Sequence, residues 1–338
     1  MIKEALHILI RGEDLSYDTT KEVMNEIMSG DATNAQIASF LTALRIKGES
    51  IDEITACAAV MREKGVKLVH NKEVIDIVGT GGDESFTFNI STVSAFVVAA
   101  AGVPVAKHGN RSVSSKCGAA DLLEALGAKL DLTAEQSAQV LEQTELCFMF
   151  APVYHTSMKY AAPVRKEMGT RTIFNILGPL ANPAGAPLQL LGVYDEALLE
   201  PMAKVLANLG VKRAMVVHGD DGLDEISLAS TTHVCELTDG ELKQYVFDPR
   251  DYGLALCNRD DLVGGDAQRN AEITRSILSG EMGAKRDIVL LNAASCFVIA
   301  GKAASIADGI LLAAEMIDSK KADAKLKEFI RATNEVSR

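Results

Sequence analysis

One stretch near residue 75 constrains the fold of this chain more than any other, because an apolar run leads straight into a glycine-rich turn. Val74–Val78 has the composition of a buried strand, and Gly79-Thr80-Gly81-Gly82-Asp83 follows with no residue between them. After a short loop, Ser91 and Thr92 are typical N-cap residues and predict a helix through Ala100. A strand, a tight turn and a helix in this order predict an α/β unit.

The same alternation continues along the chain and predicts a sheet whose strands run largely parallel. Further strands are expected at 103–106, 148–150, 190–193, 214–217 and 234–237, with helices between them. The chain is mainly helical after Asn270, with one more strand expected near Ile288–Leu290. Residues 71–338 are therefore expected to form an α/β domain around a largely parallel central sheet.

The first 70 residues have helical signals and no cluster of catalytic side chains. Capping-box patterns begin at Thr19, Thr33 and Ser50, each with Glu or Gln three residues later. Gly48 and Gly65 end the second and third of these helices. We therefore expect residues 1–70 to form a small all-helical domain, structural or dimerising in role, with the segment 155–185 packing on it.

Composition and charge exclude several classes of protein. The net charge of −12 argues against the broad basic face of a nucleic-acid-binding protein. None of the six cysteines forms a C-x-x-C pair, so zinc-like and thioredoxin-like spacings are absent and a reduced, intracellular protein is expected. The run Leu6–Ile10 is too short for a signal peptide, and no apolar stretch is long enough to span a bilayer. We therefore expect a soluble, cytoplasmic protein with no membrane partner.

Two loops that follow predicted strands carry signals of anion binding. The glycines of the 79–83 turn permit positive φ and close approach to the amides, which can form an anion nest, although a tight turn without a ligand explains this piece equally well. Asn89-Ile90-Ser91-Thr92 then opens a helix, whose N-terminus attracts phosphate. The second loop, Lys107–Lys116, holds three cations, three serines and an asparagine directly after a strand. Because the carboxyl ends of parallel strands line the ligand crevice, we favour an anion site there over a solvated basic face.

Two other segments carry charges suited to a phosphate-handling site. Asp220–Glu225 follows a predicted strand, and its clustered carboxylates suit Mg²⁺, which often bridges carboxylates to substrate phosphates. An exposed acidic turn is the alternative. Arg165 is a natural bidentate partner for a substrate carboxylate, and Arg171 is a second cation nearby, whereas a lone His155 is more often structural.

Six motifs together resemble the anthranilate phosphoribosyltransferase family, in the family's order and spacing. They are GTGGD at 79–83, TFNIST at 87–92, KHGNRSVSSK at 107–116, APVR at 162–165, RTIFNILGPLANP at 171–183 and DGLDE at 221–225. The resemblance covers almost the whole chain. It implies a helical domain joined to an α/β domain, an active site at the hinge between them, and a homodimer formed through the N-terminal helices.

The resemblance also implies a reaction and a set of site residues. The amine of anthranilate would displace pyrophosphate from phosphoribosyl pyrophosphate without a covalent nucleophile, assisted by Mg²⁺, with two ions per active site. Lys107 and Arg111 would stabilise the developing charge. The residues implied to bind phosphoribosyl pyrophosphate are Gly79, Gly82, Asp83, Thr87, Asn89, Ile90, Ser91, Thr92, Lys107, His108, Gly109, Asn110, Arg111, Ser112, Val113, Ser114, Ser115 and Ala119. Those implied for anthranilate are Gly79, Asn110 and Arg165, and those for the metal are Ser91, Asp224 and Glu225.

The chain departs from the family's usual pattern in a few places. Glu84 stands where Gly is usual, Cys117 and Ala119 stand where Ser is common, and the region around His155 and Tyr160 differs from the commonest form. Two alternatives stay open. One is a pyrimidine nucleoside phosphorylase, which is similar in architecture but lacks the DGLDE-type cluster. The other is a non-catalytic relative that binds nucleic acid, against which the negative charge argues.

Overall fold

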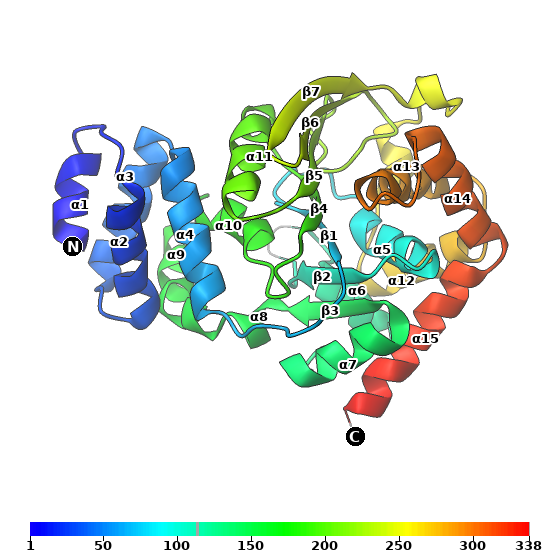
Figure 1. The fold of residues 1–338 in the computed structure, drawn as a ribbon, viewed down its shortest axis with the longest axis horizontal. Helices are drawn as coiled ribbons and strands as arrows, with labels where there is room; N and C mark the ends of the chain where they lie inside the picture. The colour runs from blue at the N-terminus through cyan, green and yellow to red at the C-terminus, as the bar shows by residue number, and fades with distance from the viewer. Residues whose placement is uncertain (113–114, 338) are drawn as a thin grey trace.

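The computed structural model describes residues 1–112 and 115–337, and a mixed β-sheet lies at its centre (Figure 1). Its strands are β1 (Ile75–Gly79), β2 (Val105–Gly109), β3 (Leu146–Phe150), β4 (Leu188–Gly192), β5 (Arg213–Gly219), β6 (Thr232–Thr238) and β7 (Glu241–Phe247). Within the described residues their order is β3-β2-β1-β4-β5-β6-β7. The strands β1 to β5 pair in parallel, whereas β6 and β7 are antiparallel to their neighbours. The predicted fold class, a helical domain with a larger α/β domain and a mostly parallel sheet, is confirmed.

Four N-terminal helices form a bundle at one end of the molecule, coloured blue in Figure 1. They are α1 (Ile2–Leu9), α2 (Tyr17–Ser29), α3 (Asn34–Lys47) and α4 (Ile51–Lys64). The capping boxes predicted at Thr33 and Ser50 are confirmed. The one predicted at Thr19 is wrong, because Ser16 caps α2: its Oγ accepts a hydrogen bond from the Thr19 N–H at 3.2 Å, so the helix begins one turn earlier.

A later part of the chain returns to this bundle. It consists of α8 (Ala151–Tyr154), the 3₁₀ turn η1 (Thr156–Tyr160), α9 (Ala162–Met168) and α10 (Phe174–Leu180). Of these, η1 packs on α2, α9 on α3, and α10 on α4. One apolar core joins the bundle, α10, β4, β5 and the helix α11 (Leu199–Asn208), so the bundle is packed onto the α/β part rather than loosely linked to it.

The other face of the sheet is covered by the C-terminal helices and α5, as Figure 1 shows. Ile75 and Ile77 of β1 belong to this core, whereas Asp76 points to the opposite face because side chains alternate along a strand. The remaining elements are α5 (Ile90–Ala100), α6 (Ala119–Leu126), α7 (Ala134–Thr144), η2 (Glu196–Leu198), η3 (Pro249–Tyr252), η4 (Arg259–Leu262), α12 (Ala267–Leu278), α13 (Ala284–Ile299), α14 (Ile306–Asp318) and α15 (Lys321–Val336).

Two further local predictions are wrong, and one strand was not predicted. Ile288–Leu290 lies inside α13, a long and almost entirely buried helix, and a short apolar run does not distinguish a buried helix from a strand. Ser91 and Thr92 do not cap α5, which begins at Ile90 with Asn89 at the N-cap. The strand β7 lies at the edge of the sheet and only Phe247 of it is buried, so its sequence has no buried-strand pattern.

Candidate active site

The site is built on strands that end in glycine. Gly79 of β1 pairs with Gly192 of β4, and the acidic loop after β5 lies across both. A Cβ on Gly192 would overlap the carbonyl oxygen of Asp224, and one on Gly79 would lie 2.8 Å from the Asp224 Cγ. Real Cβ atoms do not approach that closely, so both positions require glycine for the acidic loop to reach the strand ends.

Asp224 and Glu225 connect this loop to the two phosphate-type elements found in the sequence. The Gly81 N–H donates to Asp224 Oδ2 at 2.7 Å, and the Ser91 N–H donates to Glu225 Oε1 at 3.1 Å. Both residues are only 9% exposed, and no Lys or Arg in the described residues forms an ion pair with either carboxylate. The structure therefore brings together the glycine turn, the start of α5 and the acidic loop.

Burial disfavours the ionised form of both carboxyl groups when no cation is bound beside them. Burial raises the pKa of Glu225 to about 7, despite the opposing attraction of Lys107. Burial, followed by repulsion from Asp83 and Glu225, raises the pKa of Asp224 well above its ordinary value. No cluster of three His, Cys, Asp or Glu residues in the described chain could by itself hold an ion. The donor set fits Mg²⁺, which takes one or two carboxylates and completes its shell with water and substrate phosphates.

Lys107 lies beneath this cluster. Its side chain is 3% exposed, and Nζ donates to the carbonyl oxygen of Ile77 and to Ser91 Oγ, the latter at 3.1 Å. Burial lowers the pKa of Lys107, while the nearby Asp76 and Glu225 oppose that change. The hydrogen bond to Ser91 Oγ thus holds the Lys107 ammonium group close to the start of α5, where an anion would bind.

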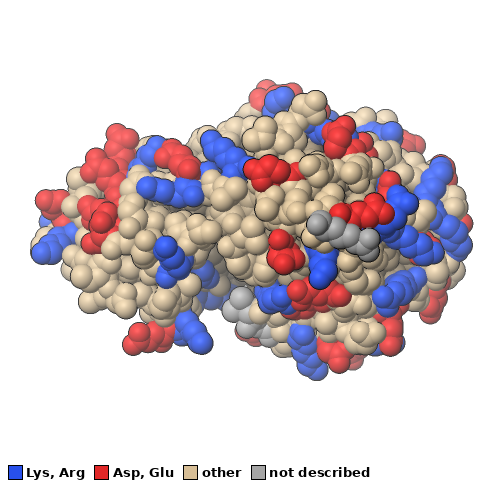
Figure 2. All heavy atoms as spheres, turned by 90° about the horizontal axis from the view of Figure 1, so that it is seen from below, with Lys and Arg blue, Asp and Glu red and all other residues tan. Residues whose placement is uncertain are grey.

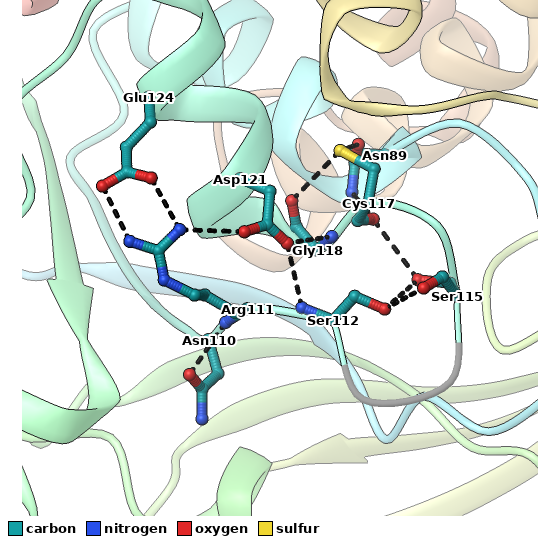
Figure 3. Close-up of polar contacts among 9 residues, drawn as sticks. All are labelled: Asn89, Asn110, Arg111, Ser112, Ser115, Cys117, Gly118, Asp121 and Glu124. Atoms are coloured by element: carbon teal, nitrogen blue, oxygen red, sulfur yellow. Dashed lines mark hydrogen bonds and ion pairs between the residues drawn. The ribbon is translucent and has the colours of Figure 1, made fainter.

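The loop after β2 is tied to α6, as Figure 3 shows. Asp121 Oδ2 accepts from the N–H groups of Ser112 (3.0 Å) and Gly118 (2.9 Å), and Ser112 Oγ donates to the carbonyl oxygen of Ser115. Asn110 is exposed, and its Oδ1 accepts from the Arg111 N–H at 2.8 Å. Val113 and Ser114, also implied as donor-binding residues, lie outside the described residues.

Arg111 is engaged by carboxylates of α6. Its guanidinium forms ion pairs with Asp121 at 2.9 Å and Glu124 at 2.6 Å (Figure 3). It also lies over the Phe150 ring, 5.4 Å from the ring centroid. Hydrogen bonds to Glu124 and Asp121 raise the pKa of this guanidinium further. Both terminal nitrogens of Arg111 are thus engaged by carboxylates in this structure.

Asn89 closes the first loop against two other segments. Its Nδ2 donates to the Cys117 carbonyl at 3.0 Å, and its Oδ1 accepts from Asn270 Nδ2 at 2.9 Å and from the Cys117 thiol at 3.4 Å. The Asn89 side chain therefore joins the segment at Cys117, as Figure 3 shows, and α12 through Asn270. Cys117 replaces a hydroxyl with a thiol that still donates to Asn89.

The other implied donor residues divide by how their side chains are placed. Ile90 and Thr92 have buried side chains, and their N–H groups donate to the carbonyl oxygens of Phe88 (2.8 Å) and Asn89 (3.1 Å). Thr87 pairs with Val263 in an isolated antiparallel bridge. Gly109 ends β2, with the Phe148 ring packed where a Cβ would lie, and Ala119 opens α6 beside it.

Of the three residues implied to bind anthranilate, Arg165 lies in α9, on the segment that returns to the bundle, whereas Gly79 ends β1 and Asn110 follows β2. The Arg165 guanidinium stacks over the Phe174 ring at 5.0 Å and forms no ion pair in the described residues, and burial lowers its pKa. His108 and His155 stand edge to face with centroids 5.0 Å apart, and burial lowers the pKa of both, that of His108 to about 3. His108 Nε2 and both ring nitrogens of His155 have no partner in the described chain. In the described residues this buried region therefore holds the Arg165 guanidinium without an ion-pair partner, and ring nitrogens of His108 and His155 without hydrogen-bond partners.

Sequence reasoning missed several residues that shape the site. Arg171, noted only as another cation, donates from Nη2 to the Gly82 carbonyl oxygen and lies over the Tyr194 ring at 4.4 Å. Thr80 Oγ1 accepts from the Tyr194 N–H at 3.1 Å. The strand–glycine pattern could have indicated that Thr80 is tethered, whereas no local signal distinguishes Tyr194.

The surface agrees with the negative charge of the chain. On the face drawn in Figure 2, Lys and Arg alternate with Asp and Glu, and no continuous basic surface is seen there. None of the helices in the described part of the chain is long and apolar enough to cross a membrane.

Fold and site together define a class of enzyme. Residues 3–65 match the helical bundle domain of the glycosyl transferase family, and residues 71–323 match its a/b domain. A strand-end site with buried carboxylates, a buried lysine and two amide-rich loops is the arrangement expected for handling a sugar diphosphate.

Comparison with individual proteins narrows that class. The anthranilate phosphoribosyltransferase of Ruminiclostridium cellulolyticum is 61% identical over 334 residues, which cover 99% of this chain and 98% of that protein. The crystal structure of the Thermus thermophilus anthranilate phosphoribosyltransferase superposes with a TM-score of 0.92 at 42% identity, covering 98% of this chain and 99% of that one. The Saccharomyces cerevisiae enzyme in complex with PRPP and Mg matches with a TM-score of 0.90 at 27% identity, covering 99% and 98% of the two chains. This chain belongs to the anthranilate phosphoribosyltransferase family.

Proposed function

We propose that this protein transfers the phosphoribosyl group of phosphoribosyl pyrophosphate to the amine of anthranilate, as a step of tryptophan biosynthesis. The products are N-(5′-phosphoribosyl)anthranilate and pyrophosphate. The observation that carries the proposal is the pair of buried carboxylates, Asp224 and Glu225, hydrogen-bonded to both phosphate-type elements. Two buried carboxylates beside anion-binding amides are favourable only if a cation and a phosphorylated ligand bind between them.

The donor would occupy the two loops that follow β1 and β2. The amides of Gly82 and Asp83 donate to no acceptor within the described residues, and Gly81 and Gly82 have positive φ, so these amides are available for a diphosphate. The N-terminus of α5 adds the positive end of the helix dipole, and its Ser91 N–H, which donates to Glu225 here, could exchange that carboxylate for a phosphate oxygen. Asp83, Thr87 and the residues 107–115 complete the donor site in this proposal.

Mg²⁺ is the cofactor that this donor set suits, and we propose two ions per site. Asp224, Glu225 and Ser91 Oγ would hold them together with the substrate phosphates. When bound, Mg²⁺ would neutralise charge that accumulates on the leaving pyrophosphate. The residues themselves supply the rest: Lys107 gives a fixed positive charge, and the loop amides give oriented dipoles in a site of low dielectric constant.

Anthranilate would bind against the segment 155–180. Arg165, which has no carboxylate partner in the described residues, would pair with its carboxylate, and Asn110 and Gly79 would contact the ring and amine. The amine of anthranilate is neutral near pH 7, so no strong base is needed before attack. The anomeric carbon would gain oxocarbenium character as pyrophosphate leaves, and attack from the opposite face would invert its configuration. Proximity and the exclusion of water would account for much of the rate.

The decisive experiment follows the fluorescence of anthranilate after addition of phosphoribosyl pyrophosphate and Mg²⁺. Loss of fluorescence that requires both additions is the expected result. A pyrimidine nucleoside phosphorylase would leave the fluorescence unchanged and would instead cleave thymidine or uridine in the presence of inorganic phosphate. Salt-dependent retention on duplex or single-stranded DNA would favour the non-catalytic alternative.

We also propose a cytoplasmic homodimer assembled through the N-terminal helices, with the two domains divided near residue 70. The bundle α1–α4 has no active-site side chain in this proposal, which leaves its outer surface available for association. Light scattering coupled to size exclusion would give twice the chain mass. A monomer at micromolar concentration would rule the dimer out.

A further inference from the structure

The Gly79–Asp83 loop is held in place by side chains and backbone groups from three other segments. From β4, the Gly192 carbonyl accepts from the Thr80 N–H at 2.9 Å, and the Tyr194 N–H donates to Thr80 Oγ1 at 3.1 Å. From the acidic loop, Asp224 accepts from Gly81. From the connection between α9 and α10, Arg171 donates to the Gly82 carbonyl oxygen. The contacts to Thr80 and Gly81 fix the first part of the loop, and the contact from Arg171 fixes the carbonyl of Gly82.

Arg171 is itself held by stacking and has no carboxylate partner. Its guanidinium lies 4.4 Å from the centroid of the Tyr194 ring, and no Asp or Glu in the described residues lies within ion-pairing distance of it. A Cβ on Gly82 would lie 3.5 Å from Arg171 Nη2, so the guanidinium is in van der Waals contact with the loop as well as hydrogen-bonded to it. In the described residues the Arg171 guanidinium is therefore oriented by the Tyr194 ring and the Gly82 carbonyl, and not by a surface ion pair.

The contact with Gly82 has a geometric consequence for the next amide. In a trans peptide the C=O of one residue and the N–H of the next point in opposite directions, and the described chain has no cis peptide. Because the Gly82 carbonyl points to Arg171, the Asp83 N–H points away from it. That N–H is one of the two loop amides without an acceptor in the described residues. The guanidinium therefore sets the direction of a free anion-binding donor.

We infer that Arg171 is a positioning residue that aims the Gly82–Asp83 peptide at the diphosphate of the donor, with Tyr194 as its stacking partner; this rests on the proposed function. Gly82 has φ of +79°, a conformation in which glycine is free to rotate its peptide plane, so without Arg171 the carbonyl and N–H can exchange directions. Arg171 lies six residues after Arg165 in the same segment, so one segment supplies a group to each substrate side.

The test compares Arg171→Ala and Arg171→Lys with Lys166→Ala, an exposed residue of the same segment that also removes one positive charge. Calorimetry with phosphoribosyl pyrophosphate and Mg²⁺ should give a Kd for Arg171→Ala raised about tenfold, the loss expected for one charge-assisted hydrogen bond. Arg171→Lys should recover part of the affinity, and Lys166→Ala should match the wild type. In the steady state, the KM for the diphosphate should rise while the KM for anthranilate stays within about twofold.

Three further measurements separate positioning from a structural role. Tyr194→Leu should weaken diphosphate binding in the same direction, whereas Tyr194→Phe, which keeps the ring, should not. Added ethylguanidinium should partly restore binding to Arg171→Ala. If Arg171→Ala binds the diphosphate as tightly as Lys166→Ala does, or if both KM values rise equally together with a fall in Tm, the inference is overturned. Failure of the proposed function would appear differently, as a wild-type protein that binds the diphosphate but does not consume anthranilate.

Discussion

Gly192, at the end of β4, lies directly against the backbone of Asp224, so closely that a Cβ on it would overlap the Asp224 carbonyl oxygen and lie 3.1 Å from its Cα. The acidic loop can therefore occupy this position only because residue 192 of β4 is a glycine and has no Cβ. This contact fixes where the carboxylates of Asp224 and Glu225 meet the glycine turn.

Gly192→Ala should displace the acidic loop and lower both activity and stability. The overlap involves backbone atoms, which cannot rotate away, so we expect a loss of about 1–3 kcal/mol in the free energy of unfolding. The KM for Mg²⁺ should rise as well. Gly178→Ala is the stability control, because a Cβ there meets no atom within 4 Å. Unchanged activity and Tm in Gly192→Ala would contradict the contact.

Glu225 should make the metal-free protein less stable as pH rises. Its folded pKa of about 7 lies above the ordinary 4.5, so the folded state holds a proton that the unfolded state releases. Stability is then highest below pH 4.5 with respect to this group and falls as pH rises to 7, by about 3 kcal/mol at most. Burial of Asp76, whose pKa is raised to about 6, adds a change of the same sign.

Glu225→Gln is the variant that isolates this effect. Its free energy of unfolding, measured by urea denaturation between pH 5 and 8, should vary less with pH than that of the wild type. The contribution of Asp76 should remain. Mg²⁺ with the diphosphate should bind the wild type more tightly as pH rises through 7, because the ionised carboxylate is the ligand. Equal pH slopes for the variant and the wild type would exclude Glu225 as the source.

Arg165→Ala should raise the KM for anthranilate about 10- to 100-fold, because a charge-assisted hydrogen bond contributes about 1.5–3 kcal/mol. The KM for the diphosphate should change far less. Initial rates with each substrate varied in turn provide the measurement, and Lys166→Ala serves as the control for loss of charge. Equal effects on both substrates would remove Arg165 from the acceptor site.

Glu124→Gln should test whether Arg111 serves the donor. Arg111 is bound by Glu124 and Asp121, and weakening the first of these pairs leaves the guanidinium freer to reach a diphosphate. The Kd for phosphoribosyl pyrophosphate should then fall, by about twofold to fivefold for a partly exposed pair of at most about 1 kcal/mol. A Kd that rises would mean that the pair holds the loop in its binding conformation.

Glu84→Gly should stabilise the protein slightly. Glu84 has φ of +56°, in the left-handed region that costs an ordinary residue about 1–2 kcal/mol. Glycine removes that cost, although its freer unfolded chain offsets part of the gain, so we expect a net increase of about 0.5–1 kcal/mol. Ser85→Gly, at a residue without positive φ, should be neutral or destabilising. A lower Tm in Glu84→Gly than in Ser85→Gly would contradict the strain.

The candidate site could be predicted in parts because its signals are local. Gly79–Asp83 begins on the last residue of β1, Lys107 lies in β2 just before its end, and Asp224-Glu225 lie in the loop after β5. In a parallel sheet neighbouring carboxyl ends meet at one edge. The capping boxes at Thr33 and Ser50 are also local and are confirmed. Ser91 as a cap and a strand at Ile288–Leu290 are wrong: Asn89 is the N-cap of α5, and Ile288–Leu290 lies in the mostly buried helix α13.

The sequence alone determined which chemical groups stand at the ends of which strands, since each pattern depends only on neighbours along the chain. Tertiary structure decided how those groups act on one another. The register that pairs Gly79 with Gly192, the burial that raises the pKa of Glu225 and the contact of Arg171 with Gly82 each join residues far apart in sequence. No local pattern encodes strand order or the side-chain packing that follows from it, so these relationships exist only once the chain has folded.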